Sequence, residues 1–232
     1  MNAAFVRNRL SPQGFLGLHL TIGVLILIGM AWLFGAIAED VVTDDQLTII
    51  DQRVAASLHA HAAPALTKAM LFISSFGASA TVTCIALAVG LFLWWRRRRY
   101  RLLALVLAVP CGMLLNVLIK YAVHRHRPIF DDPFLTLTSY SFPSGHAMGA
   151  TVLYGVLAAF TVWTVTAWRW RVLAAFGAGL LIALICFSRI YLGVHYLSDV
   201  LGGVTEGVAW LALCLTGVDT LRRQRIMNHA AR

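Results

Sequence analysis

The sequence has little charge. Only 12% of its 232 residues are Asp, Glu, Lys or Arg, whereas 59% are hydrophobic, and the mean hydropathy is +0.77. Soluble domains carry about 25% charged residues, so this composition excludes an ordinary soluble domain. Lipid must therefore cover most of the surface, and the chain is expected to be a membrane protein.

Acidic residues and paired cysteines are also scarce. The formal net charge is +9, which raises the question of nucleic-acid binding. We expect no nucleic-acid partner, because the arginines stand in short clusters between long apolar runs. The cysteines lie inside apolar runs without a CxxC spacing, which excludes the common thiolate metal motifs and predicts buried free thiols at Cys84, Cys111, Cys186 and Cys214.

Apolar stretches long enough to cross a bilayer recur along the chain. The first apolar run is too long for the hydrophobic region of a signal peptide, so we expect it to remain as an uncleaved anchor. The sequence predicts six spans, near residues Phe15–Ala38, Ala69–Trp95, Leu102–Val123, His146–Trp168, Val172–Arg189 and Tyr196–Val218.

Charge sets the expected orientation of these spans. The arginines Arg7, Arg9, Arg96–Arg99, Arg101, Arg169, Arg171, Arg222, Arg223 and Arg225 fall on one side. The acids Glu39, Asp40, Asp44, Asp45, Asp51, Asp131 and Asp132 fall on the other. The positive-inside rule places the arginine side and both termini in the cytoplasm, within a cell (inner) membrane. Tryptophans 94, 95, 168 and 170 then belong to the cytoplasmic aromatic belt.

The first external loop is predicted to contain a short interfacial helix. Thr43 and Gln46 have the spacing of a capping box, and Leu47, Ile50, Val54 and Leu58 follow at helical intervals. Ala63-Pro64 should end this helix. The predicted fold is an all-α membrane protein, a bundle of six transmembrane helices with a short interfacial helix in the first external loop. A single domain over residues 1–232 is the simplest organisation.

Three polar blocks interrupt the apolar sequence, at residues 120–128, 143–146 and 188–199. In the first block, Lys120 and Arg127 are seven residues apart, so one helix face can present both before Pro128 stops the helix. The alternative is a pair of snorkelling anchors. In the second block, Ser144 is a candidate N-cap, and the free amides that follow favour an anion. The alternative is an ordinary loop that leads into a helix.

The third block contains His195 and Asp199, which are one helical turn apart. A carboxylate there can hold one imidazole nitrogen and leave the other as an acceptor. Arg189 is out of phase with His195, so we expect a break near Gly193 that lets the two converge. The alternative is a hydrogen-bonded helix start. Together the blocks place cations and two histidines at one membrane edge, an arrangement that suits phosphoryl chemistry.

These blocks resemble the type 2 phosphatidic acid phosphatase superfamily, whose signature is Lys-x6-Arg-Pro, Pro-Ser-Gly-His and Ser-Arg-x5-His-x3-Asp. The resemblance implies that His195 is the nucleophile that forms a phosphohistidine, that Asp199 orients it, and that His146 is the general acid and base. It implies phosphate ligands at Lys120, Arg127, Ser144, Gly145 and Arg189. It also implies a site at the outer membrane face and no metal or other cofactor.

The expected function is hydrolysis of a lipid phosphate or diphosphate, with undecaprenyl diphosphate, phosphatidylglycerol phosphate and phosphatidic acid as candidate substrates. Two alternatives stay open: a lipid phosphotransferase with the same phosphohistidine, and a lipid phosphate binding or transport protein without turnover. A metal site at His124, His126, Asp131 and Asp132 is a weaker interpretation, because their spacing matches no standard motif.

Three further features lead to expectations of their own. The loop Ile129–Phe142, with Phe130, Phe134 and Tyr140, is expected to select the headgroup. Glu206 inside the last span is either a buried hydrogen-bonding residue or part of a polar path below the site. Gly203 and Gly207 form a GxxxG pattern for close helix packing. The sequence gives no oligomeric state.

Overall fold

The computed structural model describes residues 17–135 and 137–230, which form helices and no strand. The predicted all-α fold is confirmed, while Phe15, Arg7 and Arg9 lie outside the described residues. The described helices are α2 (Leu18–Thr43), α3 (Gln46–Ala60), α4 (Pro64–Ser75), α5 (Ser79–Trp95), α6 (Arg99–Val123), α7 (Gly145–Thr164), α8 (Trp168–Tyr191) and α9 (Leu197–Ala230).

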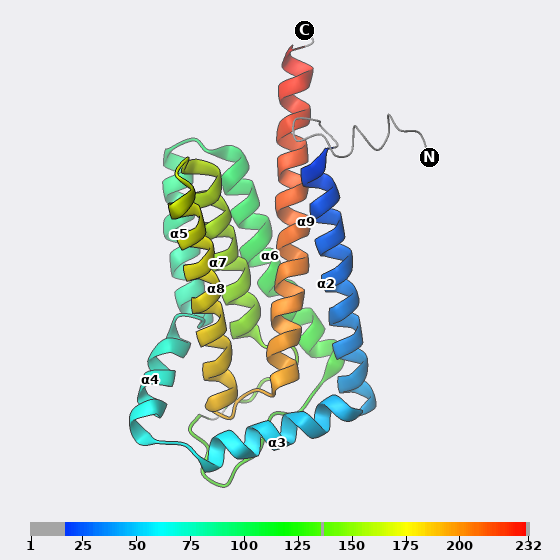
Figure 1. Cartoon of the computed structure of the whole chain (residues 1–232), viewed down its shortest axis with the longest axis vertical. Helices are drawn as coiled ribbons and strands as arrows, with labels where there is room; N and C mark the ends of the chain where they lie inside the picture. Colours follow the sequence, from blue (N-terminus) through cyan, green and yellow to red (C-terminus); the bar gives the residue numbers. More distant parts are fainter. Residues whose placement is uncertain (1–16, 136, 231–232) are drawn as a thin grey trace.

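Six segments of the described chain are long and apolar enough to cross a membrane, as predicted: α2, α4 with α5, α6, α7, α8 and α9. Several boundaries differ from the predicted ones. The largest difference is at α9, which has 34 residues and continues well past Val218. At 1.5 Å per residue it is about 50 Å long, whereas the hydrocarbon core of a bilayer is about 30 Å thick. Its C-terminal turns therefore extend beyond the other helices (Figure 1).

The second predicted span is two helices instead of one. The helix α4 ends at Ser75, and α5 begins at Ser79 after a short break that contains Gly77. Pro64, expected to end the preceding helix, also opens α4, where a missing backbone N–H has no cost. The apolar pattern alone did not reveal the break, because apolar residues continue on both sides of it.

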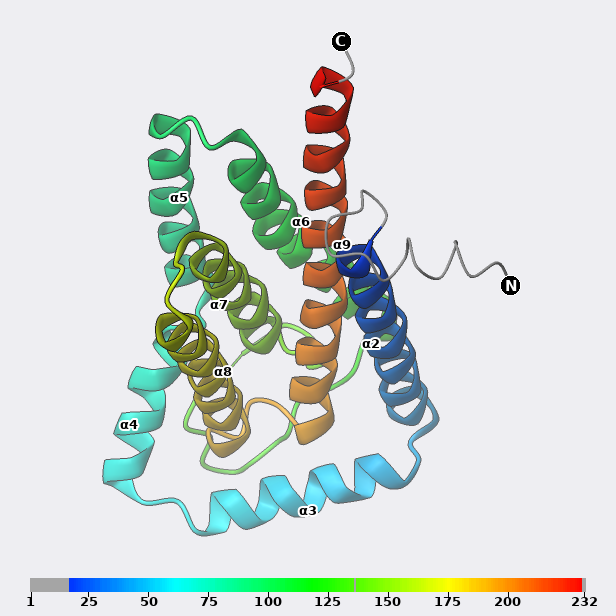
Figure 2. The same cartoon turned by 45° about the horizontal axis from the view of Figure 1, so that its top comes forward.

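The predicted helix in the first loop is α3, which lies across one end of the bundle (Figures 1 and 2). Its predicted capping box is wrong. Asp45 is the N-cap and accepts a hydrogen bond from the amide of Gln46 at 2.7 Å. Thr43 instead belongs to the last turn of α2, where its hydroxyl donates to the carbonyl of Glu39 at 2.9 Å. The helix α2 extends five residues further than predicted and takes Thr43 with it.

The two ends of the bundle differ in chemistry. The α5–α6 turn and the α7–α8 turn lie together at one end, which we call the arginine end because it carries Arg96–Arg99, Arg169 and Arg171 (Figure 1). The helix α3, the loop 124–144 and the α8–α9 turn lie at the other, which we call the site end. The tryptophans 94, 95, 168 and 170 are exposed at the arginine end. The predicted clustering of arginine and tryptophan is therefore present.

Helix α7 lies at the centre of the bundle, against α5, α6, α8 and α9, while α2 packs on α9. A Cβ at Gly203 of α9 would lie 2.5 Å from the carbonyl oxygen of Ser144, so only glycine permits this contact. A Cβ at Gly207 would lie 2.8 Å from Thr151, which confirms that the GxxxG pattern serves close packing. The N-terminus of α7 is thereby fixed against the start of α9.

The outward faces of the helices are apolar, as expected of a surface that faces lipid. Large exposed side chains include Leu25, Trp32, Leu91 and Phe92. The cysteines are all free, and Cys186 and Cys214 are buried as predicted. Cys84 is exposed, which corrects the prediction that all four thiols are buried. It lies on an outward face of α5. A soluble protein would have to bury such a face against other residues, whereas in a membrane protein lipid can cover it.

Candidate functional site: a histidine and cations at one end of the bundle

His195 and Asp199 lie where α8 gives way to α9. Nδ1 of His195 is 3.4 Å from Oδ2 of Asp199, and both side chains are buried. The predicted pairing is present, but His195 precedes the helix, which begins at Leu197. Gly193, at φ +66°, forms the turn between α8 and His195. The expected break at Gly193 is thus confirmed, since that conformation favours glycine.

Asp199 is held by several donors besides His195. Its Oδ2 accepts from the amide of Tyr196 at 2.8 Å and from the hydroxyl of Ser141, while Oδ1 accepts from Arg125 at 2.7 Å. Its backbone carbonyl accepts from the amide of Ser144 at 2.8 Å. The carboxylate therefore has a fixed orientation, which is the condition for orienting an imidazole.

The ring of His195 is neutral and accepts a hydrogen bond at one nitrogen. Burial, the largest influence, lowers its pKa to about 3, while the hydrogen bond and charge of Asp199 act in the opposite direction. Nη1 of Arg127 lies 3.2 Å from Nε2 of His195. A guanidinium only donates, so Nε2 accepts and Nδ1 carries the proton that faces Asp199. The Nε2 lone pair then points toward the cationic part of the site.

Arg127 reaches the site from a loop and not from a helix. Helix α6 ends at Val123, and His124 takes a left-handed conformation at φ 57° that turns the chain away. The prediction that Lys120 and Arg127 share one helix face is therefore wrong. The loop nevertheless brings them together, because Lys120 Nζ and Arg127 Nη2 both donate to the carbonyl of Tyr140, at 2.9 and 3.1 Å.

Arg189, on the last turn of α8, is 3% exposed and makes no ion pair with an acid in residues 17–135 or 137–228. Its Nη1 donates to Ser74 of α4 at 2.5 Å, and its Nε has no hydrogen-bond partner. A buried cation with an unused donor is costly unless an anion completes it. Arg189 is therefore suited to binding a phosphate.

The Pro-Ser-Gly-His block starts α7. Ser144 is the N-cap, as predicted, and its hydroxyl accepts from the amide of Ala147 at 3.5 Å. His146 follows in the first turn, and the charges of Arg189, Arg127 and Lys120, as well as His195, all act on it. The structure thus gathers the predicted site residues at the site end, from the ends of four helices, the α6–α7 loop and the α8–α9 connection.

Two cavities open beside these residues. One of about 230 Å³ is lined by Lys120 and Gly145 together with apolar side chains of α6 and α7, including Met113 and Met148. The other, of about 600 Å³, lies over the loop Ile129–Phe142 and is lined by Arg127 and Tyr140. Phe130 from this loop stacks on His59 of α3, with ring centroids 4.0 Å apart. The loop thus lines the larger cavity and contacts α3 beside the site.

The residues of the weaker metal interpretation have separate partners in this structure. The side chains of His124 and Asp132 have different partners, since His124 packs on Tyr140 and Asp132 accepts from His59 at 2.8 Å. This hydrogen bond lowers the pKa of Asp132. In the described part of the chain no three His, Cys, Asp or Glu side chains are placed to hold a metal ion.

Sequence reasoning did not single out four polar residues that support the site. Arg125 and Asp51 form ion pairs at its base, and Ser141 donates to Asp199. Asn116 of α6 donates to Glu206 of α9 at 2.7 Å, which confirms Glu206 as a buried hydrogen-bonding residue. No signal in the sequence separates Arg125 from its basic neighbours in the run His-Arg-His-Arg.

The fold and this site define a class: an all-helical membrane protein with a cluster of cations and histidines at one end of its bundle. The chain belongs to the PAP2 superfamily, which matches residues 101–223, more than half of its length. This match covers all three polar blocks. The chain is thus a member of a family of membrane lipid phosphatases.

Individual relatives agree with this assignment. Phosphatidylglycerophosphatase B of Bacillus subtilis is 32% identical over 163 residues, which cover 70% of this chain and 80% of that protein. An undecaprenyl-diphosphatase of Sulfolobus acidocaldarius is 28% identical over 65% of this chain and 69% of its own length. The crystal structure of a transmembrane PAP2 type phosphatidylglycerolphosphate phosphatase from Bacillus subtilis matches with a TM-score of 0.76 and 29% identity, over 83% of this chain and 95% of that one.

Proposed function

We propose that the protein hydrolyses a phosphate or diphosphate monoester of a membrane lipid through a phosphohistidine on His195. The observation that carries the proposal is the buried His195–Asp199 pair, whose second ring nitrogen, Nε2, faces Arg127. Nε2 of His195 attacks the terminal phosphorus, and the bond from that phosphorus to the leaving oxygen breaks. The leaving oxygen is the lipid oxygen in a monophosphate and the bridging oxygen in a diphosphate. His146 donates a proton to that oxygen, then takes one from the water that attacks the phosphohistidine and releases phosphate.

Cations stabilise the transition state. Its charge spreads over the equatorial phosphoryl oxygens, which Lys120, Arg127 and Arg189 can bind together with Ser144 and the amide of Gly145. We propose the outer leaflet of a cell (inner) membrane as the place of reaction, with both termini cytoplasmic, because the arginines gather at the opposite end of the bundle. The whole chain, residues 1–232, acts as one domain in this proposal.

A turnover assay on the purified protein tests the proposal. We expect release of free phosphate from phosphatidylglycerol phosphate, undecaprenyl diphosphate or phosphatidic acid in detergent. The value of kcat/KM should exceed that for a short soluble ester by at least about a hundredfold, because the tail orients the phosphate at the site. Transfer of phosphate to a lipid acceptor instead of water would identify the phosphotransferase alternative. Tight binding without turnover would identify a lipid-binding protein.

Cysteine labelling tests the orientation. In a background without the four native cysteines, Ile129→Cys is expected to react with an impermeant thiol reagent added outside intact cells. Ile129 is 90% exposed, so its reactivity reports the side of the membrane and not burial. Arg96→Cys, at the arginine end, is expected to stay unlabelled until the membrane is opened. The reverse pattern would place the site in the cytoplasm.

Removal of divalent metal ions is expected to leave activity unchanged. Three cationic side chains occupy the place that a metal takes at the phosphoryl oxygens of other enzymes. Vanadate, which adopts the geometry of the transition state, should inhibit. The measurement is phosphate release after exhaustive chelation. Activity that disappears with the chelator and returns with one divalent ion would contradict the proposal.

A further inference from the structure

A buried ion-pair network joins α3 to the catalytic histidine. Asp51 of α3 is 1% exposed, and Asp199 is fully buried. Arg125 lies between them: its Nη2 donates to Asp51 at 2.8 Å, and its Nη1 donates to Asp199 at 2.7 Å. Ser198 connects the same groups, since its amide donates to Asp51 at 2.9 Å and its hydroxyl accepts from Arg125 at 2.6 Å.

The network leaves Asp199 with one oxygen for each task. Oδ1 binds Arg125, while Oδ2 faces His195. Arg125 on Oδ1, together with Tyr196 and Ser141 on Oδ2, therefore sets the rotation of the carboxylate. A guanidinium next to Asp199 also weakens the negative charge that His195 feels. Asp51 offsets this effect, because it pairs with the other nitrogen of the guanidinium, Nη2. The two carboxylates and the one guanidinium together therefore keep one net negative charge.

We propose that Arg125 and Asp51 are positioning residues that set the orientation of Asp199 and its electrostatic pull on His195. This inference rests on the proposed function. It also accounts for a buried acid on a helix that lies across the end of the bundle, where an unpaired carboxylate would be costly. The helix α3 thereby contributes to the site without contact with substrate.

The test is a pair of charge changes with opposite expected effects. Arg125→Gln removes a cation beside Asp199, so protonation of His195 becomes easier. The acid limb of the pH profile of kcat should therefore move up by about one pH unit. Asp51→Asn leaves Arg125 entirely on Asp199, so the limb should move down. The double variant Asp51→Asn/Arg125→Gln removes both effects, and its limb should return toward that of the wild type.

Other charged groups that face His195 stay in place in all these variants. They are Asp199 on α9, Lys120 on α6, His146 on α7 and Arg127 in the loop, while Arg189 on α8 acts on the neighbouring His146. Because the phosphate ligands Lys120, Arg127 and Arg189 are intact, KM should change less than twofold. Arg125→Lys keeps the charge but cannot bridge two acids, so it should lower kcat by about tenfold without a shift of the acid limb.

Loss of stability alone would reduce the folded fraction and scale all rates without shifts of opposite sign. Equal acid limbs in every variant, or shifts of the same sign, would overturn the inference. Titration of His195 by nitrogen-15 NMR gives the same comparison without turnover, so it remains decisive if a variant is inactive. An inactive wild type would instead contradict the proposed function, which is a distinguishable result.

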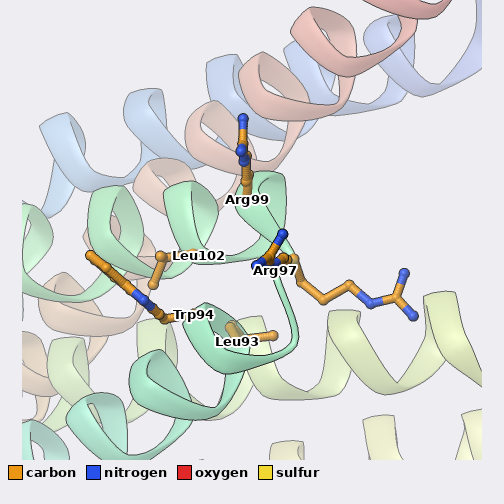
Figure 3. Close-up of a pocket in the computed structure, with 6 residues that line it drawn as sticks. Leu93, Trp94, Arg97, Arg99 and Leu102 are labelled. Atoms are coloured by element: carbon orange, nitrogen blue, oxygen red, sulfur yellow. The ribbon is translucent and has the colours of Figure 1, made fainter.

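A second inference rests on the arginine end. A cavity of about 340 Å³ at the α5–α6 turn is lined by Trp94, Arg97, Arg98, Arg99, Leu93 and Leu102 (Figure 3). It continues into an apolar groove of about 270 Å³ between α5 and α6, since Trp94 and Leu102 line both. Within the described chain, no acid forms an ion pair with Arg97, Arg98 or Arg99.

We infer that this cavity and groove bind one anionic phospholipid of the leaflet at the arginine end. The phosphate would lie on the arginines near the uncapped N-terminus of α6, and one chain would lie in the groove. Charge complementarity favours an anionic over a zwitterionic lipid. The arginines of the α7–α8 turn differ, because Arg171 donates to the carbonyl of Val165 at 2.6 Å and Arg169 lies over the ring of Trp170.

Native mass spectrometry of the protein from nanodiscs that contain equal phosphatidylglycerol and phosphatidylcholine tests this inference. The wild type is expected to retain one phosphatidylglycerol. Arg97→Gln/Arg99→Gln should lower its retention at least fivefold, whereas the matched control Arg169→Gln/Arg171→Gln should not. Equal retention by both double variants, or retention of phosphatidylcholine to the same extent, would overturn the inference.

Discussion

Replacement of His195 by alanine is expected to lower turnover of a lipid phosphate by about 10⁴-fold or more, because no other described side chain can take its place at phosphorus. The ring is buried and lies between Asp199 and Arg127, an orientation that alanine cannot reproduce. Phosphate release is the first measurement. The second is a rapid quench with labelled substrate, in which the wild type should carry acid-labile phosphate and the variant none.

A matched control separates this loss from misfolding. His61 lies at the same end of the bundle, is exposed, and its ring Nδ1 lies 2.8 Å from the carbonyl oxygen of Ser57. The variant His61→Ala should keep wild-type turnover and the same elution from a sizing column as His195→Ala. Wild-type turnover by His195→Ala would remove the nucleophile from the proposed mechanism.

The variant Arg189→Gln is expected to lower kcat/KM by about 10²- to 10³-fold, the usual cost of removing one preorganised donor to a phosphoryl or oxyanion group. Arg189 is buried, and Ser74 satisfies only part of its guanidinium. An amide of similar size leaves the packing against α4 in place but removes the charge. Steady-state kinetics on a lipid phosphate, with and without added inorganic phosphate as competitor, should show weaker competition as well.

The control for Arg189 lies on the same helix. Arg171→Gln removes a cation at the opposite end of α8 and should change kcat/KM by less than twofold. A third variant, Arg189→Lys, should recover only part of the loss, because an ammonium lacks the planar fork of the guanidinium. Full activity of Arg189→Gln would mean that the buried cation serves the packing of α8 on α4 and not the phosphate.

The sequence predicted the six spans and the set of charged residues at the site end, because bilayer thickness and the spacing of polar blocks are local properties. It did not predict how Arg127 arrives. The seven-residue spacing from Lys120 suggested one helix, whereas His124 ends α6 and a loop brings the guanidinium back. Helix termination at a left-handed histidine has no clear sequence signal, since glycine or asparagine usually marks it.

Contacts between distant segments were equally beyond the sequence. Arg125 and Asp199 are 74 residues apart, and so are Arg125 and Asp51. Periodicity cannot indicate that three such segments meet. Asp51 sits on a helix whose amphipathic pattern was recognised, yet the pattern alone does not tell a buried carboxylate from a solvated one. The break between α4 and α5, which presents Ser74 to Arg189, was missed for a similar reason.

The carbonyl of Tyr140 accepts from both Lys120 and Arg127. A phosphoryl group that binds these cations must compete with this peptide oxygen, so part of the gross attraction is used to exchange one acceptor for another. Ground-state affinity is thereby moderated, while contacts that are completed only in the transition state still lower the barrier. The exchange also removes hydrogen bonds that hold residues 139–141. The rate at which a protease cleaves this loop therefore reports how far Lys120 and Arg127 have exchanged the peptide oxygen for the phosphoryl group.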